Sequence, residues 1–223
     1  MIKVPYEAKV ALAYHQINHD DKQGKYQPNF EWDYMTYTIQ GLLLTNLPRN
    51  SVNKTLTDIG SGQGKWPALL SPYFDQVVSI EPDESSFEKQ KSLNEILKLE
   101  NIDLYNDGMP ECLEKINSQA VLLSSSLHLT EDWKYCFQKL LNDPILQWIA
   151  IFDGPDLDTF DPSLFSNKHG SLSKRRPITI GDEWYMHDQA EEQGWFARLF
   201  NIDTDEQMAK TETANRWLLL LER

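Results

Sequence analysis

The chain has few cysteines and no long apolar segment. Its two cysteines, Cys112 and Cys136, do not form a Cys-x-x-Cys pair, so neither a zinc site nor a dithiol redox motif is expected. No apolar run approaches the ~20 residues that span a bilayer, and the N-terminal region lacks the apolar core of a signal peptide. We therefore expect a cytoplasmic protein with free thiols and no membrane association.

Positive charge is also scarce. The 21 Lys and Arg residues are outnumbered by 34 Asp and Glu residues, which gives a formal net charge of −13. Because binding to nucleic acid depends on cationic side chains that displace counterions from phosphates, we expect no nucleic-acid partner. The same negative field favours neutral or cationic ligands. One local exception is a basic cluster within residues 168–176.

Short apolar strands alternate with helical patterns along most of the 223 residues. This alternation is typical of an α/β protein with a mostly parallel sheet and helices on both faces. In such sheets, ligands bind at the carboxyl ends of the strands, near the point where the strand order reverses. The last two strands are expected to form a hairpin. The expected strands are residues 54–59, 77–81, 102–105, 120–124, 148–152, 200–208 and 216–221, and the expected helices are residues 30–45, 66–73, 84–98, 110–116, 133–141 and 189–199.

A glycine-rich loop follows the first expected strand, with the spacing Gly60-x-Gly62-x-Gly64. Glycines at this place let the backbone turn sharply and approach a ligand closely. The dinucleotide fingerprint G-x-G-x-x-G does not fit, because Lys65 occupies the position of its third glycine. Asp58 precedes the loop, and its carboxylate would repel a pyrophosphate but attract the ammonium group of a methionine moiety. The loop therefore favours a nucleoside cofactor that carries an amino acid.

Acidic residues also follow the next two strands. Glu81 ends the second expected strand, where a carboxylate can accept hydrogen bonds from both ribose hydroxyls. Pro82 is then expected to shape the wall beside an adenine. Asp107 follows the third strand and can accept a hydrogen bond from the exocyclic amine of adenine, although Asn106 or Asp103 could serve instead, or none of them.

Together, Asp58, the glycine loop, Glu81 and Asp107 resemble the motifs of class I S-adenosylmethionine-dependent methyltransferases. The resemblance covers residues 30–223 and implies a Rossmann-like, seven-stranded, mostly parallel sheet with an antiparallel C-terminal hairpin. It implies S-adenosylmethionine as the cofactor, with Asp58 and the loop at its methionine part, Glu81 at the ribose and Asp107 at the adenine. The expected cofactor-binding residues are Asp58, Gly60, Ser61, Gly62, Gly64, Glu81, Pro82, Asp107, Gly108, Ser124 and Ser125.

The fourth expected strand ends in three serines, Ser124 to Ser126, at the tip that faces the transferred methyl group in the family. The sequence Ser-Ser-Ser-Leu replaces the Asn/Asp-Pro-Pro-aromatic tetrad that is typical of enzymes acting on base amino groups or glutamine amides. Ser124 also replaces the metal-binding acid of catechol-type enzymes, so no metal is expected. His128 is the candidate catalytic base, because a pKa near neutrality lets it accept a proton from a hydroxyl. Alternatively, His128 packs under the tip and orients Ser125 or a substrate group.

Two segments are expected to cover the substrate. They are an N-terminal lid at residues 1–29, which precedes the main domain at residues 30–223, and an insertion at residues 154–187, since connections of that length are usually functional or mobile. The basic cluster in the insertion either binds a carboxylate or phosphate or is a solvated loop that balances nearby acids. The candidate substrate-binding residues are Tyr14, Tyr26, Trp32, Arg175, Arg176 and Trp184.

The sequence thus predicts an enzyme that transfers a methyl group to an oxygen (hydroxyl or carboxyl) or a nitrogen of a small molecule or peptide. Two other classes stay open. One is an NAD-type oxidoreductase, which the glycine spacing and Asp58 disfavour. The other is a non-catalytic partner protein that binds S-adenosylmethionine.

Overall fold

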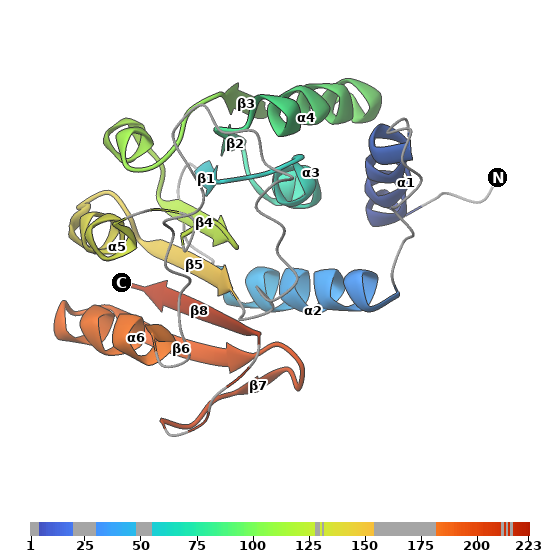
Figure 1. Ribbon diagram of the computed structural model, residues 1–223. Helices are drawn as coiled ribbons and strands as arrows, with labels where there is room; N and C mark the ends of the chain where they lie inside the picture. Colours follow the sequence, from blue (N-terminus) through green and yellow to red (C-terminus); the bar gives the residue numbers. More distant parts are fainter. Residues whose placement is uncertain are drawn as a thin grey trace.

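The computed structural model describes residues 5–19, 30–47, 55–127, 130, 132–153, 182–210, 212, 214 and 216–223. Within these residues the chain forms an eight-stranded sheet with the strand order β3-β2-β1-β4-β5-β8-β6-β7 (Figure 1). The strands are β1 (Thr55–Ile59), β2 (Gln76–Ile80), β3 (Ile102–Tyr105), β4 (Ala120–Ser124), β5 (Trp148–Asp153), β6 (Phe196–Asn201), β7 (Glu206–Gln207) and β8 (Trp217–Glu222).

The first five strands are parallel, and the order reverses at β1. Strand β1 pairs with β2 on one side and with β4 on the other, so the connections leave it in opposite directions. The loops after β1 and β4 therefore separate at the carboxyl edge of the sheet, which is where α/β proteins of this kind bind ligands. Strand β8 is antiparallel to both β5 and β6, which confirms the expected antiparallel C-terminal strands.

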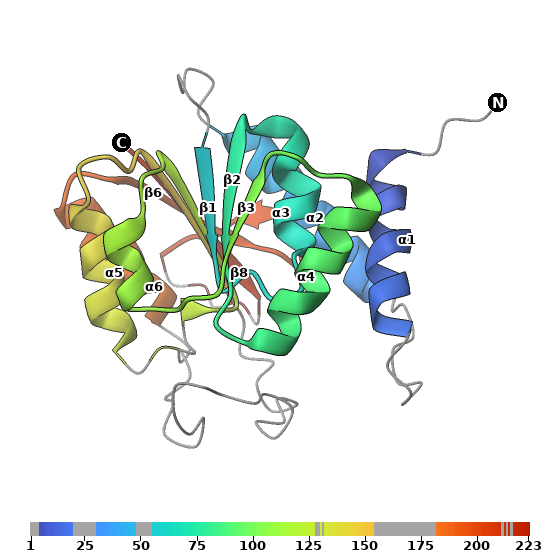
Figure 2. The ribbon, with the colours of Figure 1, turned by 90° about the horizontal axis from the view of Figure 1, so that it is seen from above.

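Helices cover both faces of the sheet, as the alternating pattern predicts (Figure 2). Helices α1 to α4 lie on one face, and α5 and α6 lie on the other. The four leucines 218–221 of β8 alternate between the two hydrophobic cores, because successive side chains of a strand point to opposite faces. The helices are α1 (Tyr6–His19), α2 (Phe30–Asn46), α3 (Lys65–Leu70), α4 (Glu84–Leu97), α5 (Trp133–Asn142) and α6 (Asp182–Glu192), with short 3-10 helices at Ser71–Tyr73 and Glu111–Lys115.

Two C-terminal elements differ from the prediction. Helix α6 begins at Asp182, seven residues before the predicted start. Strand β6 occupies Phe196–Asn201, of which residues 196–199 were predicted to be helical. Gly194 separates the two elements with a φ of 82°, a backbone conformation that glycine adopts readily. The two-residue strand β7 extends the expected seven-stranded sheet to eight strands.

Helix α1 lies in the N-terminal segment, for which the sequence pattern predicts no helix. Val10 and Ala13 are buried on one side of α1, and the hydroxyl of Tyr6 donates a hydrogen bond to the Ala68 carbonyl at 2.7 Å. Helix α1 therefore packs on α3 and α4 at the outside of the sheet (Figure 2). The division into a lid, residues 1–29, and a main domain stays a prediction.

None of the helices in the described part of the chain is both long and apolar enough to cross a membrane.

Candidate functional site

The glycine loop turns at the carboxyl end of β1, between β2 and β4. Gly60, Gly62 and Gly64 have φ values of 72°, 58° and 85°, in the left-handed region that glycine tolerates best. The N–H groups of Gly60 and Ser61 both donate to the Ile80 carbonyl of β2, at 2.8 and 3.0 Å. The loop is thus fixed against the neighbouring strand by its own backbone.

The three glycines of the loop lack a side chain for two different reasons. A Cβ on Gly60 would lie 2.3 Å from the Cβ of Ser126, and a Cβ on Gly64 would lie 2.7 Å from Cγ of Gln90. A Cβ on Gly62 would meet no atom of the described residues within 4 Å. Gly60 and Gly64 therefore allow close packing within the protein, whereas Gly62 presents bare backbone toward open space, as a ligand-binding loop requires.

Asp58 lies at the end of β1, and its side chain is fully buried (0% exposed). Neither of its carboxylate oxygens has a hydrogen-bond partner among the described residues. Burial raises the pKa of Asp58 well above its usual range, the nearby Glu81 carboxylate raises it further, and the Lys65 ammonium partly opposes both. Most buried carboxylates are paired, so Asp58 is a strong candidate for binding a cationic group.

The Glu81 carboxylate, which is 7% exposed, ties the tip of β2 to the glycine loop. Its Oε2 accepts a hydrogen bond from the Gly62 N–H at 2.7 Å, and its Oε1 accepts one from the Asp83 N–H at 2.9 Å. Burial raises the pKa of Glu81, and the two backbone hydrogen bonds oppose that rise. Each carboxylate oxygen can accept a further hydrogen bond, so Glu81 can hold the loop and a ligand hydroxyl together.

The loop after β3 is joined to the tip of β2. The Asn106 side chain donates to the carbonyls of Glu81 and Pro82, at 2.9 and 3.3 Å. Asp107 accepts from the Gly108 N–H at 2.9 Å and forms an ion pair with Lys115. A Cβ on Gly108 would lie 3.1 Å from the Cβ of Pro82, so the two loops are in close contact. Asp107 thus lies in a loop that Asn106 joins to the tip of β2, and its role at the adenine stays a prediction. The structural contacts of Asn106 were not predicted from the sequence.

The serines at the tip of β4 have three different environments. Ser124 Oγ accepts a hydrogen bond from the indole Nε1 of Trp66 in α3, at 2.8 Å. Ser125 is exposed and has a φ of 52°, which is uncommon for a residue other than glycine and is frequent at functional sites. Ser126 is buried, and its hydroxyl donates to the Ile59 carbonyl at 2.6 Å. The tips of β1 and β4 are thereby fixed beside each other. His128 lies outside the described residues.

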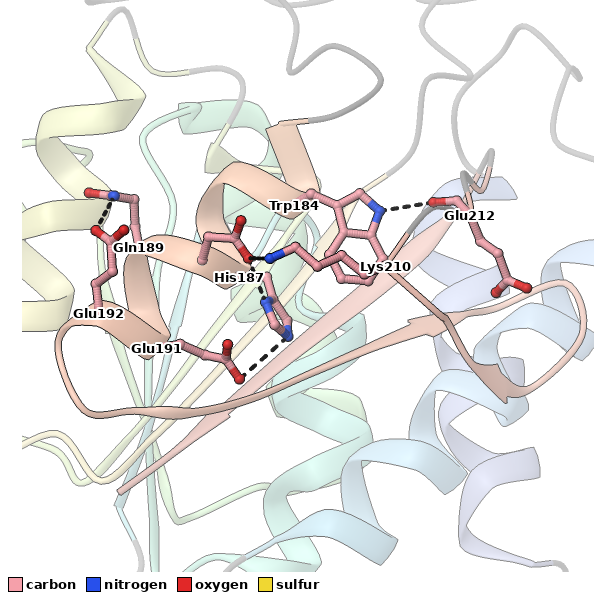
Figure 3. Close-up of polar contacts among 8 residues, drawn as sticks. Trp184, His187, Gln189, Glu191, Glu192, Lys210 and Glu212 are labelled. Carbon is pink, nitrogen blue, oxygen red and sulfur yellow. Dashed lines mark hydrogen bonds and ion pairs between the residues drawn. The ribbon is translucent and has the colours of Figure 1, made fainter.

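The structure does not bring the described substrate-binding candidates together. Tyr14 packs against the core on the α1–α4 face of the sheet, whereas Trp184 packs against the core on the α5–α6 face. Trp184 donates its indole N–H to the Glu212 carbonyl at 2.8 Å and contacts the His187 ring, so it links α6 to the segment before β8 (Figure 3). Tyr26, Arg175 and Arg176 lie outside the described residues, and only the backbone of Trp32, in α2, is described.

One group of side chains on α6 is close enough together to be considered as a metal site. One ligand atom from each of His187, Asp188 and Glu191 lies within 4.8 Å of the others. However, Asp188 contacts Nδ1 of the His187 ring at 3.2 Å, while Glu191 is nearest Nε2 at 3.9 Å, on the other side of the ring (Figure 3). The Lys210 ammonium also binds Asp188 at 3.0 Å. The three side chains therefore form a chain of polar contacts rather than a common centre, and we assign no metal to them.

Several residues of the site carry no recognisable signal in the sequence. Lys65 marks only a departure from the dinucleotide pattern, and Ser126 is one serine among three. Gln90 is fully buried in α4 and donates to Ser61 Oγ at 3.2 Å. Its one signal is a helical stripe shared with Leu93 and Leu97, in which a polar residue occupies an otherwise apolar face.

The same fold occurs in solved methyltransferase structures of low sequence identity. The methyltransferase domain of bacterial CtHen1 matches with a TM-score of 0.59 and 15% identity, over 85% of this chain and 100% of that chain. A S-adenosylmethionine-dependent methyltransferase from Clostridium acetobutylicum matches with a TM-score of 0.59 and 10% identity, over 96% and 98% of the two chains. The structure of the DhpI-SAM-HEP complex matches with a TM-score of 0.53 and 13% identity, over the whole of both chains. No protein-family profile matches the chain, and no curated protein matches it in sequence.

At identities this low, the likeness establishes the fold alone. The chain has the Rossmann-like fold of class I S-adenosylmethionine-dependent methyltransferases, as its sequence motifs predict.

Proposed function

We propose that the protein transfers the methyl group of S-adenosylmethionine to an oxygen (hydroxyl or carboxyl) or a nitrogen of a small molecule or peptide. The observation that carries the proposal is Asp58, a fully buried carboxylate without a hydrogen-bond partner among the described residues. It lies near Glu81, which binds the backbone of Gly62. A buried, unpaired carboxylate is costly to the fold. An ammonium group from the methionine part of the cofactor would offset that cost.

The neighbouring loops suit the rest of the cofactor. Glu81 would accept the ribose hydroxyls, because its oxygens keep acceptor capacity beyond their bonds to Gly62 and Asp83. Pro82 and Gly108, which lie in contact, would form the wall beside the adenine. Asp107 would accept a hydrogen bond from the exocyclic amine of adenine, either in addition to its ion pair with Lys115 or in place of it.

The charge of this cradle separates two cofactor classes. Asp58 and Glu81 are both buried acids, and the Glu81 carboxylate is close enough to raise the pKa of Asp58. Such a pair would repel the pyrophosphate of NAD, whereas it stabilises a nucleoside that carries a sulfonium and an ammonium group. The cradle therefore favours S-adenosylmethionine over a dinucleotide.

The main contribution of the protein to methyl transfer would be to position the reactants. The cofactor supplies an electrophilic methyl group. The protein orients the acceptor atom toward that group and excludes water, and an aligned pair of reactants provides a large part of the rate acceleration. Ser125, which has a positive φ at the tip of β4, would bind the cofactor near its methyl group, where the acceptor would also lie. We assign His128 the role of base when the acceptor is a hydroxyl.

Titration calorimetry of the full chain with S-adenosylhomocysteine and, separately, with NAD tests the proposal. Binding of S-adenosylhomocysteine alone, with one site per chain, supports it. Binding of NAD alone refutes it. Transfer of label from methyl-labelled S-adenosylmethionine to fractionated small-molecule and peptide pools then separates an enzyme from a non-catalytic binding protein, which would bind the cofactor but label nothing.

A further inference from the structure

A second charged side chain, Lys65, lies beside the glycine loop, opposite in sign to Asp58. Lys65 is the first residue of α3 and directly follows Gly64. Its ammonium lies 3.4 Å from Oγ1 of Thr36 in α2 and 4.5 Å from the ring centroid of Trp66. Helix α2 and helix α3 thus hold this cation between them, and its charge acts on the buried Asp58.

The residues around Lys65 are held in place by contacts with the rest of the protein. Trp66, which is buried, is fixed by its hydrogen bond to Ser124 at the tip of β4. The ring beneath the Lys65 ammonium is therefore held in place and attracts a cation. On α2, Thr36 and Gln40 are both buried polar residues four positions apart, on the same side of the helix. Polar groups of α2 are thus buried on the side where α2 meets Lys65, although the neighbouring Ile39 and Leu43 belong to the apolar core.

We infer that Lys65 binds the carboxylate of the cofactor's amino-acid part, while Asp58 binds its ammonium, so that the pair selects nucleosides carrying a complete amino acid. This inference rests on the proposed function and adds a specificity-determining residue to it. A zwitterion carries one positive and one negative group a few bonds apart. These two charges match the buried acid and the cation that flank the glycine loop, Asp58 at the end of β1 and Lys65 at the start of α3. Lysine binds a carboxylate as a point charge, and a charge-assisted bond of this kind is stronger than a neutral one.

Three ligands that differ only in the amino-acid part separate the contributions. They are S-adenosylhomocysteine, its decarboxylated analogue, which keeps the amine, and 5′-methylthioadenosine, which lacks both charged groups. For the wild-type chain we expect calorimetry to show a preference for S-adenosylhomocysteine over the decarboxylated analogue of about 10- to 100-fold. Lys65→Met should reduce this preference to within about threefold and leave the affinity for 5′-methylthioadenosine unchanged.

Two control variants distinguish the loss of the Lys65 charge from a general loss of structure. Lys65→Arg keeps the charge and should keep most of the preference. Lys91→Met removes a cation from α4 that pairs with Glu88 at the surface, and it should leave all three affinities unchanged. The inference is overturned if Lys65→Met keeps the wild-type preference for S-adenosylhomocysteine over the decarboxylated analogue. It is also overturned if the wild-type chain shows no such preference, and that result does not depend on whether a variant folds. If neither S-adenosylhomocysteine nor 5′-methylthioadenosine binds the wild-type chain, the proposed function itself fails and the inference falls with it.

Discussion

Replacing Asp58 by asparagine should make the ligand-free protein more stable near neutral pH and its stability less dependent on pH. The Asp58 side chain is fully buried, and the N–H groups of the adjacent loop that could have paired with it donate elsewhere, to Ile80 and Glu81. Burial and the Glu81 carboxylate therefore raise the pKa of Asp58 in the folded state, against partial opposition from Lys65. The unfolded chain has no such environment, and there the carboxyl group titrates at about 4.

The sign of the pH effect follows from proton binding. Between the unfolded and the folded pKa of Asp58, the folded state binds more protons than the unfolded state, so the free energy of unfolding falls as pH rises. The slope for one such group reaches about 1.4 kcal/mol per pH unit. An amide of the same shape does not titrate, but its unpaired polar atoms cost about 1–3 kcal/mol. We expect Asp58→Asn to gain about 1–2 kcal/mol at pH 7.5, or a rise of about 2–8 °C in Tm for a chain of this size.

Thermal and urea unfolding between pH 5 and pH 8, without ligand, measures this effect. Glu81 keeps a raised pKa of its own, so a shallower slope should remain in the variant. Asp75→Asn, at an exposed position, is the control and should change neither Tm nor slope. With saturating S-adenosylhomocysteine the wild-type chain should gain more stability than the variant. An Asp58→Asn chain that is less stable at pH 7.5 and has the wild-type pH slope would refute the reasoning.

Three further changes probe the cradle and the tip of β4. Gly62→Val should reduce the affinity for S-adenosylhomocysteine at least about 100-fold in calorimetry, because a branched side chain at φ 58° projects into the space proposed for the ligand. The control variant Gly41→Ala, in α2, should bind S-adenosylhomocysteine with the wild-type affinity. Trp66→Phe removes the donor to Ser124 and should lower the free energy of unfolding in urea by about 1–2 kcal/mol. A double variant with Ser124→Ala that loses clearly less stability than the two single variants together would confirm the pairing, and an additive loss would deny it. His128→Ala should lower turnover at least about 100-fold with little change in S-adenosylhomocysteine affinity, and equal losses in both would remove its assignment as base.

Much of the parallel half of the fold can be predicted from the sequence, for a physical reason. Strands β4 and β5 in particular are short apolar runs, because a strand buried on both faces has that pattern regardless of its tertiary partners. The edge strand β3 instead alternates partly buried and exposed residues, which is also a strand pattern. The glycine spacing and the acids after β1, β2 and β3 likewise locate the cradle, because each follows a strand whose carboxyl end must reach the same edge.

The C-terminal half and helix α1 give weaker signals. Helix α6 buries Met186, Ala190 and the charged Glu183, so its buried side has few apolar residues to mark it. Helix α1 likewise buries only small or isolated apolar residues, such as Val10 and Ala13. In both cases the buried side depends on neighbouring elements that are distant in sequence.

The pairing of the charged residues in the site could not be predicted from the local sequence pattern either. Asp58 has no hydrogen-bond partner within the described part of the chain because the nearby Gly60 and Ser61 N–H groups donate to Ile80 instead. That Lys65 lies over Trp66 beside Thr36 depends on how α2 meets α3. Such contacts are set by packing in three dimensions, so spacing along the chain identifies the residues but not their charge balance.

A crystal structure of the full chain with S-adenosylhomocysteine tests the central claim most directly. Our account predicts the nucleoside across the carboxyl ends of β1, β2 and β3, with its amine toward Asp58 and its ribose hydroxyls on the Glu81 carboxylate. A nucleoside bound at another edge of the sheet, or one that leaves Asp58 and Glu81 untouched, would contradict it.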